Sequence, residues 1–360
     1  MEEELLLIGA ESRTAVPLAG RLLARAADER IDGSPLTGEL HREMLEVITR
    51  PHDALHTLHD EVVANRATAD RLARLLGARA VPLATCPSST VPHPSDAARY
   101  RRMLDRYGSL PRRILSCGLH VHVGIASDDE GVAVLDRIRT WTPVLLAMSV
   151  NSPFHDGVDT GHASWRSVAW NQCPSSGPME VYGSAERYRR ATRTLLDTGT
   201  LLDPGMLYFD ARLSHHHPTV EVRVADVPLD PGTTTTIAAL VRALADTAVE
   251  DWRDGRPPAE ASVSAIRLAN WCASSNGLAG DLVDPLTWRP APARDVVGAL
   301  LAKVMPALAA NGDDQVVERG VADLFRFGTG AERQRAAHRD TGDPVSAALT
   351  NPPEQVLRTP

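Results

Sequence analysis

Two pairs of glutamates have the spacing of metal-binding carboxylates. Glu2, Glu3 and Glu4 stand directly before an apolar run, and on a β-strand Glu2 and Glu4 point to one face and Glu3 to the other. Two carboxylates on one strand face repel each other unless a cation lies between them. Glu39 and Glu46 share one face of a helix predicted over 35–46, because seven positions are two helical turns. A solvated acidic surface is the alternative for each pair.

A pair of histidines lies in a strand predicted over 117–126. His120 and His122 alternate with Leu119, Val121 and Val123, so both imidazoles project from the same face. A polar pair on one face of an otherwise apolar strand needs a metal, an anion or a carboxylate as its partner. Two hydrogen-bonded core histidines are the alternative interpretation.

A carboxylate and a guanidinium lie side by side on a valine-rich strand predicted over 219–227. Glu221 and Arg223 share one face of this strand, and Arg212 lies on the strand before it. Such a pair can bind a divalent cation and the phosphate that the cation bridges, and a cross-strand ion pair is the alternative. The three consecutive histidines at 215–217 fall in the turn between the strands and are interpreted as solvated.

The combination of these side chains favours phosphoryl transfer onto a substrate carboxylate. Carboxylate oxygens suit Mg²⁺ or Mn²⁺ better than zinc, and such an ion bridges nucleotide phosphates. Positioning and charge neutralisation supply most of the catalysis in this chemistry, so it requires no nucleophilic side chain of the protein.

Composition excludes several other classes of protein. The 360 residues carry 38 basic and 46 acidic side chains, and the net charge of −8 disfavours nucleic-acid and membrane partners. Lys303 is the single lysine and lies in an apolar helical stretch, so neither a P-loop nor a pyridoxal-phosphate Schiff base is credible. The chain has no apolar run of about 18 residues, no signal-peptide pattern and no C-x-x-C pair. We therefore predict a cytoplasmic protein with free thiols.

Hydrophobic periodicity predicts an α+β fold, with strands early and in the middle of the chain and helices between and after them. The region 151–178, rich in Gly, Ser and Pro, is predicted to be one long loop. Further strands are expected over 2–9, 78–86 and 206–214. The remaining helices are expected over 53–76, 97–107, 132–150, 185–196, 233–248, 261–274, 293–310 and 315–327.

Five segments in a fixed order resemble one known family. They read EEELLLIG, LEVITRP, GLHVHVGI, NSPFHDGVDTGHASWRS and PTVEVRVADV, and the resemblance to the ATP-dependent carboxylate–amine ligases, or glutamate–cysteine ligases type 2, covers about residues 2–338. It implies a single glutamine-synthetase-like catalytic domain over 1–360, mostly helical over about 231–345, whose curved antiparallel sheet forms a cavity with helices packed outside. It also implies an activity in which ATP converts a carboxylate into an acyl phosphate and an amine displaces the phosphate.

The resemblance assigns roles to residues of this chain. It implies Mg²⁺, with Mn²⁺ as a substitute, glutamate as the acid, cysteine as the nominal amine, and a homodimer. Arg223 would neutralise the transferred phosphoryl group, and His122, or alternatively His120, would lie beside the nucleotide phosphates. Arg166 and Arg212 would hold nucleotide or substrate. The implied metal ligands are Glu2, Glu4, Glu39, Glu46 and Glu221.

Three positions depart from the family pattern. Met1 stands where the family has Val in a longer opening, so we expect less strand pairing beside Glu2 and an α-ammonium group near the metal. Cys272 and Ser275 replace two arginines of an Arg-rich motif, which puts anion or substrate binding there in doubt. His155 replaces an aromatic or bulky residue, a change that is expected to alter the selectivity for the amine.

Two other functions fit part of the sequence. A metal-dependent hydrolase would use His120 and His122 with Asp226, and it predicts zinc dependence without ATP. A non-catalytic relative would bind only a nucleotide or metabolite, an interpretation that the departures favour and the pair of Glu221 and Arg223 opposes.

Overall fold

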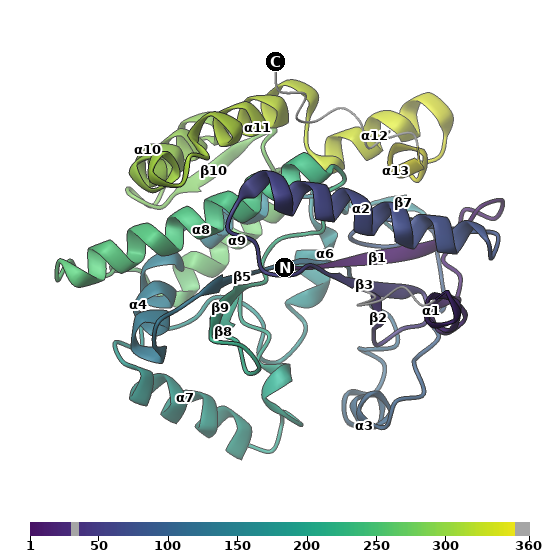
Figure 1. The fold of residues 1–360 in the computed structure, drawn as a ribbon, viewed down its shortest axis with the longest axis horizontal. Coiled ribbons are helices and arrows are strands. Elements are labelled where there is room, and N and C mark those ends of the chain that lie inside the picture. Colours follow the sequence, from purple (N-terminus) through teal and green to yellow (C-terminus); the bar gives the residue numbers. More distant parts are fainter. Residues whose placement is uncertain (30–35, 350–360) are drawn as a thin grey trace.

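The structure, a computed structural model, describes residues 1–29 and 36–349 (Figure 1). Within these residues, seven strands form one antiparallel sheet in the order β2–β3–β1–β5–β9–β8, and β4 pairs with the end of β1 beyond β5. Two small hairpins, β6–β7 and β10–β11, lie outside it. The strands are β1 (Glu2–Gly9), β2 (Leu36–Gly38), β3 (Met44–Ile48), β4 (Ala78–Val81), β5 (Leu119–Gly124), β6 (Phe154–His155), β7 (Val158–Asp159), β8 (Ala211–Leu213), β9 (Thr219–Val222), β10 (Asp281–Asp284) and β11 (Arg289–Pro292).

Helices cover one face of this sheet. Figure 1 shows α2 and α8 along that face, with α10 and α11 stacked outside α8, while α3 and α7 lie on the opposite side. The helices are α1 (Ala19–Asp28), α2 (Leu55–Arg74), α3 (Ala98–Tyr107), α4 (Asp128–Ile138), α5 (Thr142–Ser149), α6 (Trp165–Trp170), α7 (Ala185–Asp197), α8 (Pro231–Arg253), α9 (Val263–Asn276), α10 (Ala293–Asn311), α11 (Asp314–Phe327), α12 (Gly330–Thr341), α13 (Ser346–Leu349) and a short 3₁₀ helix, η1 (Pro204–Met206).

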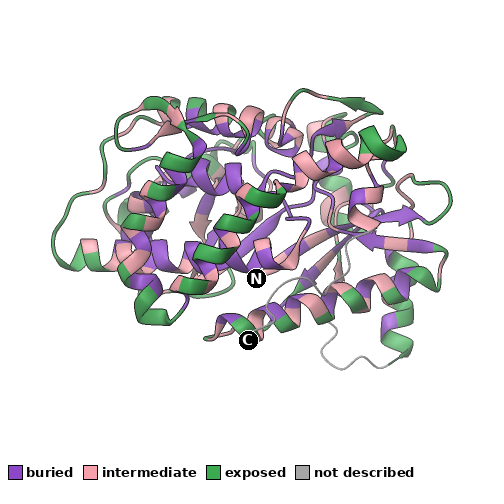
Figure 2. Cartoon of the chain, turned by 90° about the horizontal axis from the view of Figure 1, so that it is seen from above, coloured by how far each residue is buried: buried purple, intermediate pink, exposed green. Residues whose placement is uncertain are grey.

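The first half of the central helix α8 is buried around most of its circumference, as expected for a helix that lies between two layers. It begins at Pro231, a residue suited to the first helical turn, and the side chain of Asp230 accepts the N–H of Gly232 as a cap. The central strands of the main sheet and the inner faces of the helices are mostly buried, and the exposed residues gather on the outer faces (Figure 2). None of the described helices has the length and apolar composition to cross a bilayer.

Glu3 anchors the sheet to the helical layer. Its carboxylate points away from Glu2 and Glu4, as the alternation of a strand predicts, and it is 2% exposed. Arg66 of α2 donates to both carboxylate oxygens at 2.6 and 2.8 Å, and Thr234 of α8 donates its hydroxyl at 2.8 Å. These hydrogen bonds to the buried Glu3 carboxylate fix α2 and α8 relative to β1.

Removing the partner of this buried charge is expected to destabilise the protein strongly. Arg66→Ala should lower the free energy of unfolding by about 3 kcal/mol, because it leaves the Glu3 carboxylate buried without a countercharge. Arg74→Ala on the same helix is the control, since Arg74 is 62% exposed and its ion pair with Asp70 should be worth less than about 1 kcal/mol. Chemical denaturation measures both values, and equal losses would contradict the prediction.

The α+β prediction is confirmed, but three local predictions are wrong. The segment 36–46 of the helix predicted over 35–46 instead forms the hairpin β2–β3. Residue 35 lies outside the described residues. Pairing of β3 with β1 overrides the helical spacing there. The single helix over 132–150 is two helices, α4 and α5, and the second begins with a proline in its first turn.

The third wrong prediction is the long loop over 151–178. This region contains the hairpin β6–β7 and the helix α6, whose first turn is capped by the Ser164 side chain. Local patterns do not predict β10, β11, α12 and α13, which are short or polar. The hairpin β10–β11 contacts α9 and α10, whereas Gln334 of α12 donates to Asn151 and Ala347 of α13 packs in the core with β1.

Candidate active site

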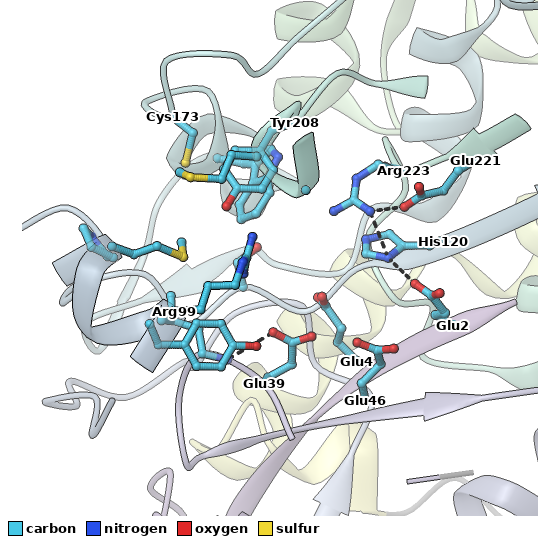
Figure 3. A pocket seen from close by; sticks show the side chains of 18 of the residues that line it. Glu2, Glu4, Glu39, Glu46, Arg99, His120, Cys173, Tyr208, Glu221 and Arg223 are labelled. Carbon is cyan, nitrogen blue, oxygen red and sulfur yellow. Dashed lines mark hydrogen bonds and ion pairs between the residues drawn. The ribbon is translucent and has the colours of Figure 1, made fainter. Parts of the chain in front are cut away.

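Nine of the ten side chains predicted for the site line one cavity of about 410 Å³ (Figure 3). The cavity lies on the face of the sheet that α2 and α8 leave uncovered, and residues of α3 and η1 line its other side. The nine residues are Glu2, Glu4, Glu39, Glu46, His120, His122, Arg212, Glu221 and Arg223.

Strand pairing explains why these side chains meet. Residues directly opposite each other on neighbouring antiparallel strands have Cβ atoms roughly 5 Å apart, and their side chains share a face. The opposed pairs in the sheet are Glu4 and Glu46, Glu2 and His120, His122 and Glu221, and Arg212 and Glu221. The polar side chains of each strand therefore lie beside those of the neighbouring strand, on the same face of the sheet.

Glu2 is held by both histidines of β5. His120 Nδ1 lies 3.0 Å from one carboxylate oxygen, and His122 Nε2 lies 3.3 Å from the other. Burial by itself would raise the pKa of Glu2, but the contacts with His120 and His122 outweigh it and hold the pKa well below its usual range. Burial, followed by the nearby Arg223, lowers the pKa of His120 to about 4. Glu2 is therefore ionised at neutral pH, beside a neutral imidazole that donates to it.

Two guanidinium groups hold Glu221. Arg212 Nε lies 2.7 Å from one carboxylate oxygen, and Arg223 contacts the other. Burial opposes ionisation of Glu221, yet the charges of Arg223 and Arg212 lower its pKa to about 2. Arg223 keeps its Nε without a hydrogen-bond partner among the described residues. The pair therefore combines an ionised carboxylate with a guanidinium that lines the cavity and keeps one buried N–H group without a partner.

The remaining carboxylates repel one another. Burial raises the pKa of Glu46 well above its usual range, and the neighbouring Glu39 raises it further. Burial and the charge of Glu39 also raise the pKa of Glu4, although Arg166 and the N–H of Gly118, which donates at 2.6 Å, act against this. Figure 3 shows Glu4, Glu39 and Glu46 gathered on one side of the cavity. A divalent cation would relieve this repulsion.

The donor set fits such a cation. Among the described residues, Glu2, His122 and Glu221 each offer one ligand atom, and these atoms lie within 4.8 Å of one another. Carboxylate oxygens are the ligands that Mg²⁺ prefers, and they also bind Mn²⁺. His122 Nδ1 lies 2.9 Å from the Thr219 hydroxyl, which orients its other ring nitrogen toward Glu2.

The raised pKa values predict a pH-dependent stability. The folded protein holds protons on Glu4 and Glu46 at pH values where the unfolded chain, with carboxyl pKa values near 4.5, has lost them. The free energy of unfolding should therefore fall as pH rises from about 4.5 through the raised pKa values, and Mg²⁺ should recover more stability at about pH 9 than at about pH 7. Melting temperatures with and without Mg²⁺ measure this effect.

The matched comparison for this prediction is Glu46→Gln. This variant has one carboxyl fewer, so its melting temperature should fall less steeply with pH in the absence of Mg²⁺. The buried histidines and the amino group of Met1 are present in both proteins, so their contributions cancel in the difference. Parallel curves for the two proteins would contradict the assignment of the effect to this cluster.

Arg166 is the one predicted site residue that does not line the cavity. It is 3% exposed and donates to the carbonyls of Arg223 and Val224 at 3.3 Å each. Its guanidinium also packs against Gly118, where a Cβ atom would lie 2.3 Å from Nη2. Arg166 therefore braces the backbone behind Glu4 and Arg223 instead of facing a ligand.

The structure shows what surrounds the residues that depart from the family pattern. The expected loss of strand pairing beside Glu2 is wrong, because Glu2 is opposed by His120 on one side and Ile48 on the other. The amino group of Met1 donates to the Thr49 hydroxyl at 3.2 Å. Elsewhere, His155 stacks on a tryptophan, and neither it nor Cys272 and Ser275 of α9 lines the cavity.

The sequence model of one protein family, glutamate–cysteine ligase family 2, matches residues 1–348 of this chain. The chain belongs to this family. A relative from Streptomyces coelicolor, provisionally named glutamate–cysteine ligase 2, is 47% identical over 342 residues, which cover 95% of this chain and 94% of the relative. One from Nocardioides sp., provisionally named glutamate–cysteine ligase 2-1, is 48% identical over 361 residues, which cover 95% and 91%.

The fold is also that of a solved ligase. A crystal structure of a glutamate–cysteine ligase from Francisella tularensis in complex with AMP matches with a TM-score of 0.65, over 97% of this chain and 86% of that one. At 13% identity this likeness concerns the fold alone. This likeness confirms the predicted fold, and the family match confirms the predicted family and the assignment of the chain as a ligase that forms C–N bonds.

The structure does not assemble the residues of the alternative hydrolase site. Asp226 is fully buried and accepts hydrogen bonds from the Asn151 N–H and from the hydroxyls of Ser152 and Ser164. It does not line the cavity that His120 and His122 line. The ligase therefore uses Asp226 to fix the loop after α5.

Several cavity residues of this family 2 ligase were missed from sequence. Arg99 and Tyr100 come from α3, where the sequence predicts only a basic helix, and Arg99 forms an ion pair with Asp203 at 2.8 Å. Cys173 and Tyr208 come from segments without a motif. The histidines at 215–217 are exposed, as interpreted, yet they also line the rim of the cavity.

Proposed function

We propose that this ligase uses ATP and Mg²⁺ to join a carboxylate, with glutamate the first choice, to an amine through an acyl phosphate. Cysteine is the first amine to test. The observation that carries the proposal is the convergence of five carboxylates, two histidines and Arg223 from separate segments in one cavity. The homodimer and the cytoplasmic location implied by the resemblance stay predictions.

Carboxylates are proposed to hold the metal. Mg²⁺, when bound, neutralises the charge of the nucleotide phosphates and fixes their orientation. Its ligands would come from Glu2 and Glu221, which are ionised in the folded protein, and from Glu4, Glu39 and Glu46, whose mutual repulsion a cation would relieve.

Arg223 is proposed to stabilise the transferred phosphoryl group. The substrate carboxylate oxygen attacks the γ-phosphorus, the bond to the β-phosphate oxygen breaks, and ADP leaves with the electron pair. The amine nitrogen then attacks the acyl carbon, loses a proton and releases phosphate. Arg223 faces the cavity, and its fixed contact with Glu221 leaves its other N–H groups for the equatorial oxygens. His120 and His122 keep Glu2 ionised and oriented.

Amine-dependent ADP release tests this function. The purified protein is incubated with ATP, Mg²⁺, glutamate and a panel of amines, and the amide product is identified by mass spectrometry. We expect ADP and amide in equal amounts, and release about a thousandfold slower with the variant Glu221→Gln. Binding of ATP without turnover for any acid and amine would support a non-catalytic relative, and zinc-dependent hydrolysis without ATP would support the hydrolase.

A further inference from the structure

One of the five segments that resemble the family, residues 151–167, lines no part of the catalytic cavity, although all of it is described. Four of its polar side chains are nevertheless buried, with exposed fractions of 3% or less: Asn151, Ser152, Ser164 and Arg166. A buried polar group costs free energy unless it is hydrogen-bonded. The partners of these side chains therefore show what the segment holds in place.

The four side chains gather around Asp226, which is fully buried behind the cavity. Ser152 and Ser164 donate their hydroxyls to its carboxylate at 2.7 and 2.8 Å, and the N–H of Asn151 donates at 2.9 Å. Arg166 Nη1 lies 3.6 Å from Asp226 Oδ1 and supplies the countercharge. These five residues are called the buried polar cluster below.

Arg166 connects the buried polar cluster to the wall of the cavity. Its Nη2 donates to the carbonyl of Arg223 and its Nη1 to the carbonyl of Val224, each at 3.3 Å. The same guanidinium packs against Gly118, whose N–H donates to the Glu4 carboxylate at 2.6 Å. One buried side chain therefore contacts the backbone beside both Arg223 and Glu4.

Helix α12 fixes the far side of the buried polar cluster. Gln334 of α12 is 1% exposed and donates its side-chain amide to the carbonyl and the Oδ1 of Asn151 at 2.8 and 2.6 Å. Asn151 in turn donates to the carbonyls of Pro82 and Val227 at 2.7 and 2.8 Å. Because the cluster is tied to these separate parts of the chain, Arg166 is held in one position.

Stability alone is a weak reason for a buried ion pair. Removing an arginine and an aspartate from water costs about as much free energy as their attraction returns, so the pair adds little net stability. Its geometry is specific, however, and a shift of about 1 Å in a group that contacts the transition state can lower a rate about a hundredfold. The placement of Arg223 and Glu4 is therefore the effect that the buried polar cluster can have on the reaction.

We propose that Arg166 and Asp226 are positioning residues of this ligase. They fix the backbone of Arg223 and Gly118, so that the Arg223 guanidinium faces the transferred phosphoryl group and the Glu4 carboxylate faces the metal. This inference rests on the proposed function, because that function gives Arg223 and Glu4 their roles. Since neither positioning residue contacts a ligand, both should affect kcat and leave substrate binding nearly unchanged.

Gly118→Ala tests the proposal without removing a charge or a hydrogen-bonding group. The added Cβ would lie 2.3 Å from Arg166 Nη2, so the flexible end of that side chain must move, while the N–H at position 118 stays available to Glu4. We expect kcat for amide formation to fall at least about tenfold, with the KM values of ATP, acid and amine within about threefold of wild type. The melting temperature should fall by less than about 3 °C, because no partner of a buried group is deleted.

A double-mutant cycle with Arg166→Lys shows whether this effect passes through Arg166. Lysine keeps the positive charge beside Asp226 but has no Nη2 group to contact Gly118. Arg166→Lys by itself should lower kcat about tenfold, and adding Gly118→Ala should then change kcat by less than about twofold. Equal losses from Gly118→Ala in the wild-type and Arg166→Lys backgrounds would overturn the proposal.

A buried arginine elsewhere supplies the matched control. Arg139 is 1% exposed and donates to the carbonyls of Met179 and Ala261 at 2.8 and 2.9 Å, but it does not line the cavity. Arg139→Lys should lower the melting temperature and leave kcat within about twofold of wild type.

The outcomes separate this inference from the proposed function. If Arg166→Lys lowers the melting temperature as Arg139→Lys does and leaves kcat unchanged, Arg166 has a structural role only, so the inference fails and the proposed function stands. A rise in the KM of one substrate at constant kcat would also overturn the inference, because it would make Arg166 part of substrate binding. Failure of the wild type to form any amide would overturn both.

Discussion

Glu221→Gln is expected to lower kcat/KM for amide formation by about a thousandfold, which equals about 4 kcal/mol of transition-state stabilisation. The carboxylate of Glu221 contacts both Arg212 and Arg223 and is a proposed metal ligand. Glutamine keeps the size of the side chain but removes its charge, so the two guanidinium groups lose their common partner. Coupled detection of ADP with glutamate and the best amine measures the loss.

Glu130→Gln is the control for a lost buried carboxylate. Glu130 is 8% exposed, accepts the N–H of Ala126 at 2.9 Å and contacts Arg253 at 3.1 Å, but it lies outside the cavity. The substitution should lower the melting temperature and leave kcat/KM within about twofold of wild type. A Glu221→Gln protein with wild-type kcat/KM would remove Glu221 from the proposed mechanism.

Glu46→Gln is expected to separate stability from activity. Burial and the neighbouring Glu39 disfavour the ionised form of Glu46, so a neutral side chain should raise the free energy of unfolding of the metal-free protein by about 1 kcal/mol. The same change removes a proposed metal ligand and should lower kcat by at least about a hundredfold. Melting curves without Mg²⁺ and initial rates with Mg²⁺ measure the two effects.

An exposed glutamate controls for the general effect of removing a negative charge. Glu186 on α7 is 79% exposed in its side chain and pairs with Arg190 on the same helix. Glu186→Gln should change the free energy of unfolding by less than about 0.5 kcal/mol and leave the rate unchanged. A Glu46→Gln protein that is both less stable and fully active would mean that Glu46 has a structural role only.

Local sequence predicted the face of the functional side chains on β1, β5 and β9. The separation of Glu3 from Glu2 and Glu4, the common face of His120 and His122, and the common face of Glu221 and Arg223 all follow from the two-residue repeat of a strand. The family resemblance then predicted that these strands share one cavity. No pattern within any one strand contains that information.

The wrong predictions fall where distant contacts override local spacing. Glu39 and Glu46 have helical spacing, yet β3 pairs with β1 and Glu39 reaches the cavity from the loop after β2. Arg166 and Asp226 are polar residues near the motifs, and each instead satisfies buried backbone and hydroxyl groups behind the cavity. Hydrogen-bond partners so far apart in the chain leave no periodic signal.

The sequence by itself therefore determined the strands β1, β5 and β9, the common face of the polar side chains on each of them, and the family. Only the tertiary structure decided that Glu46 lies on a strand, the order and register that set Glu4 against Glu46 and His122 against Glu221, and the contribution of α3 to the cavity. The physical reason is the distance along the chain over which each interaction acts. Alternation along a strand is set by the backbone of adjacent residues, whereas strand order and cavity lining depend on packing between segments far apart in the chain.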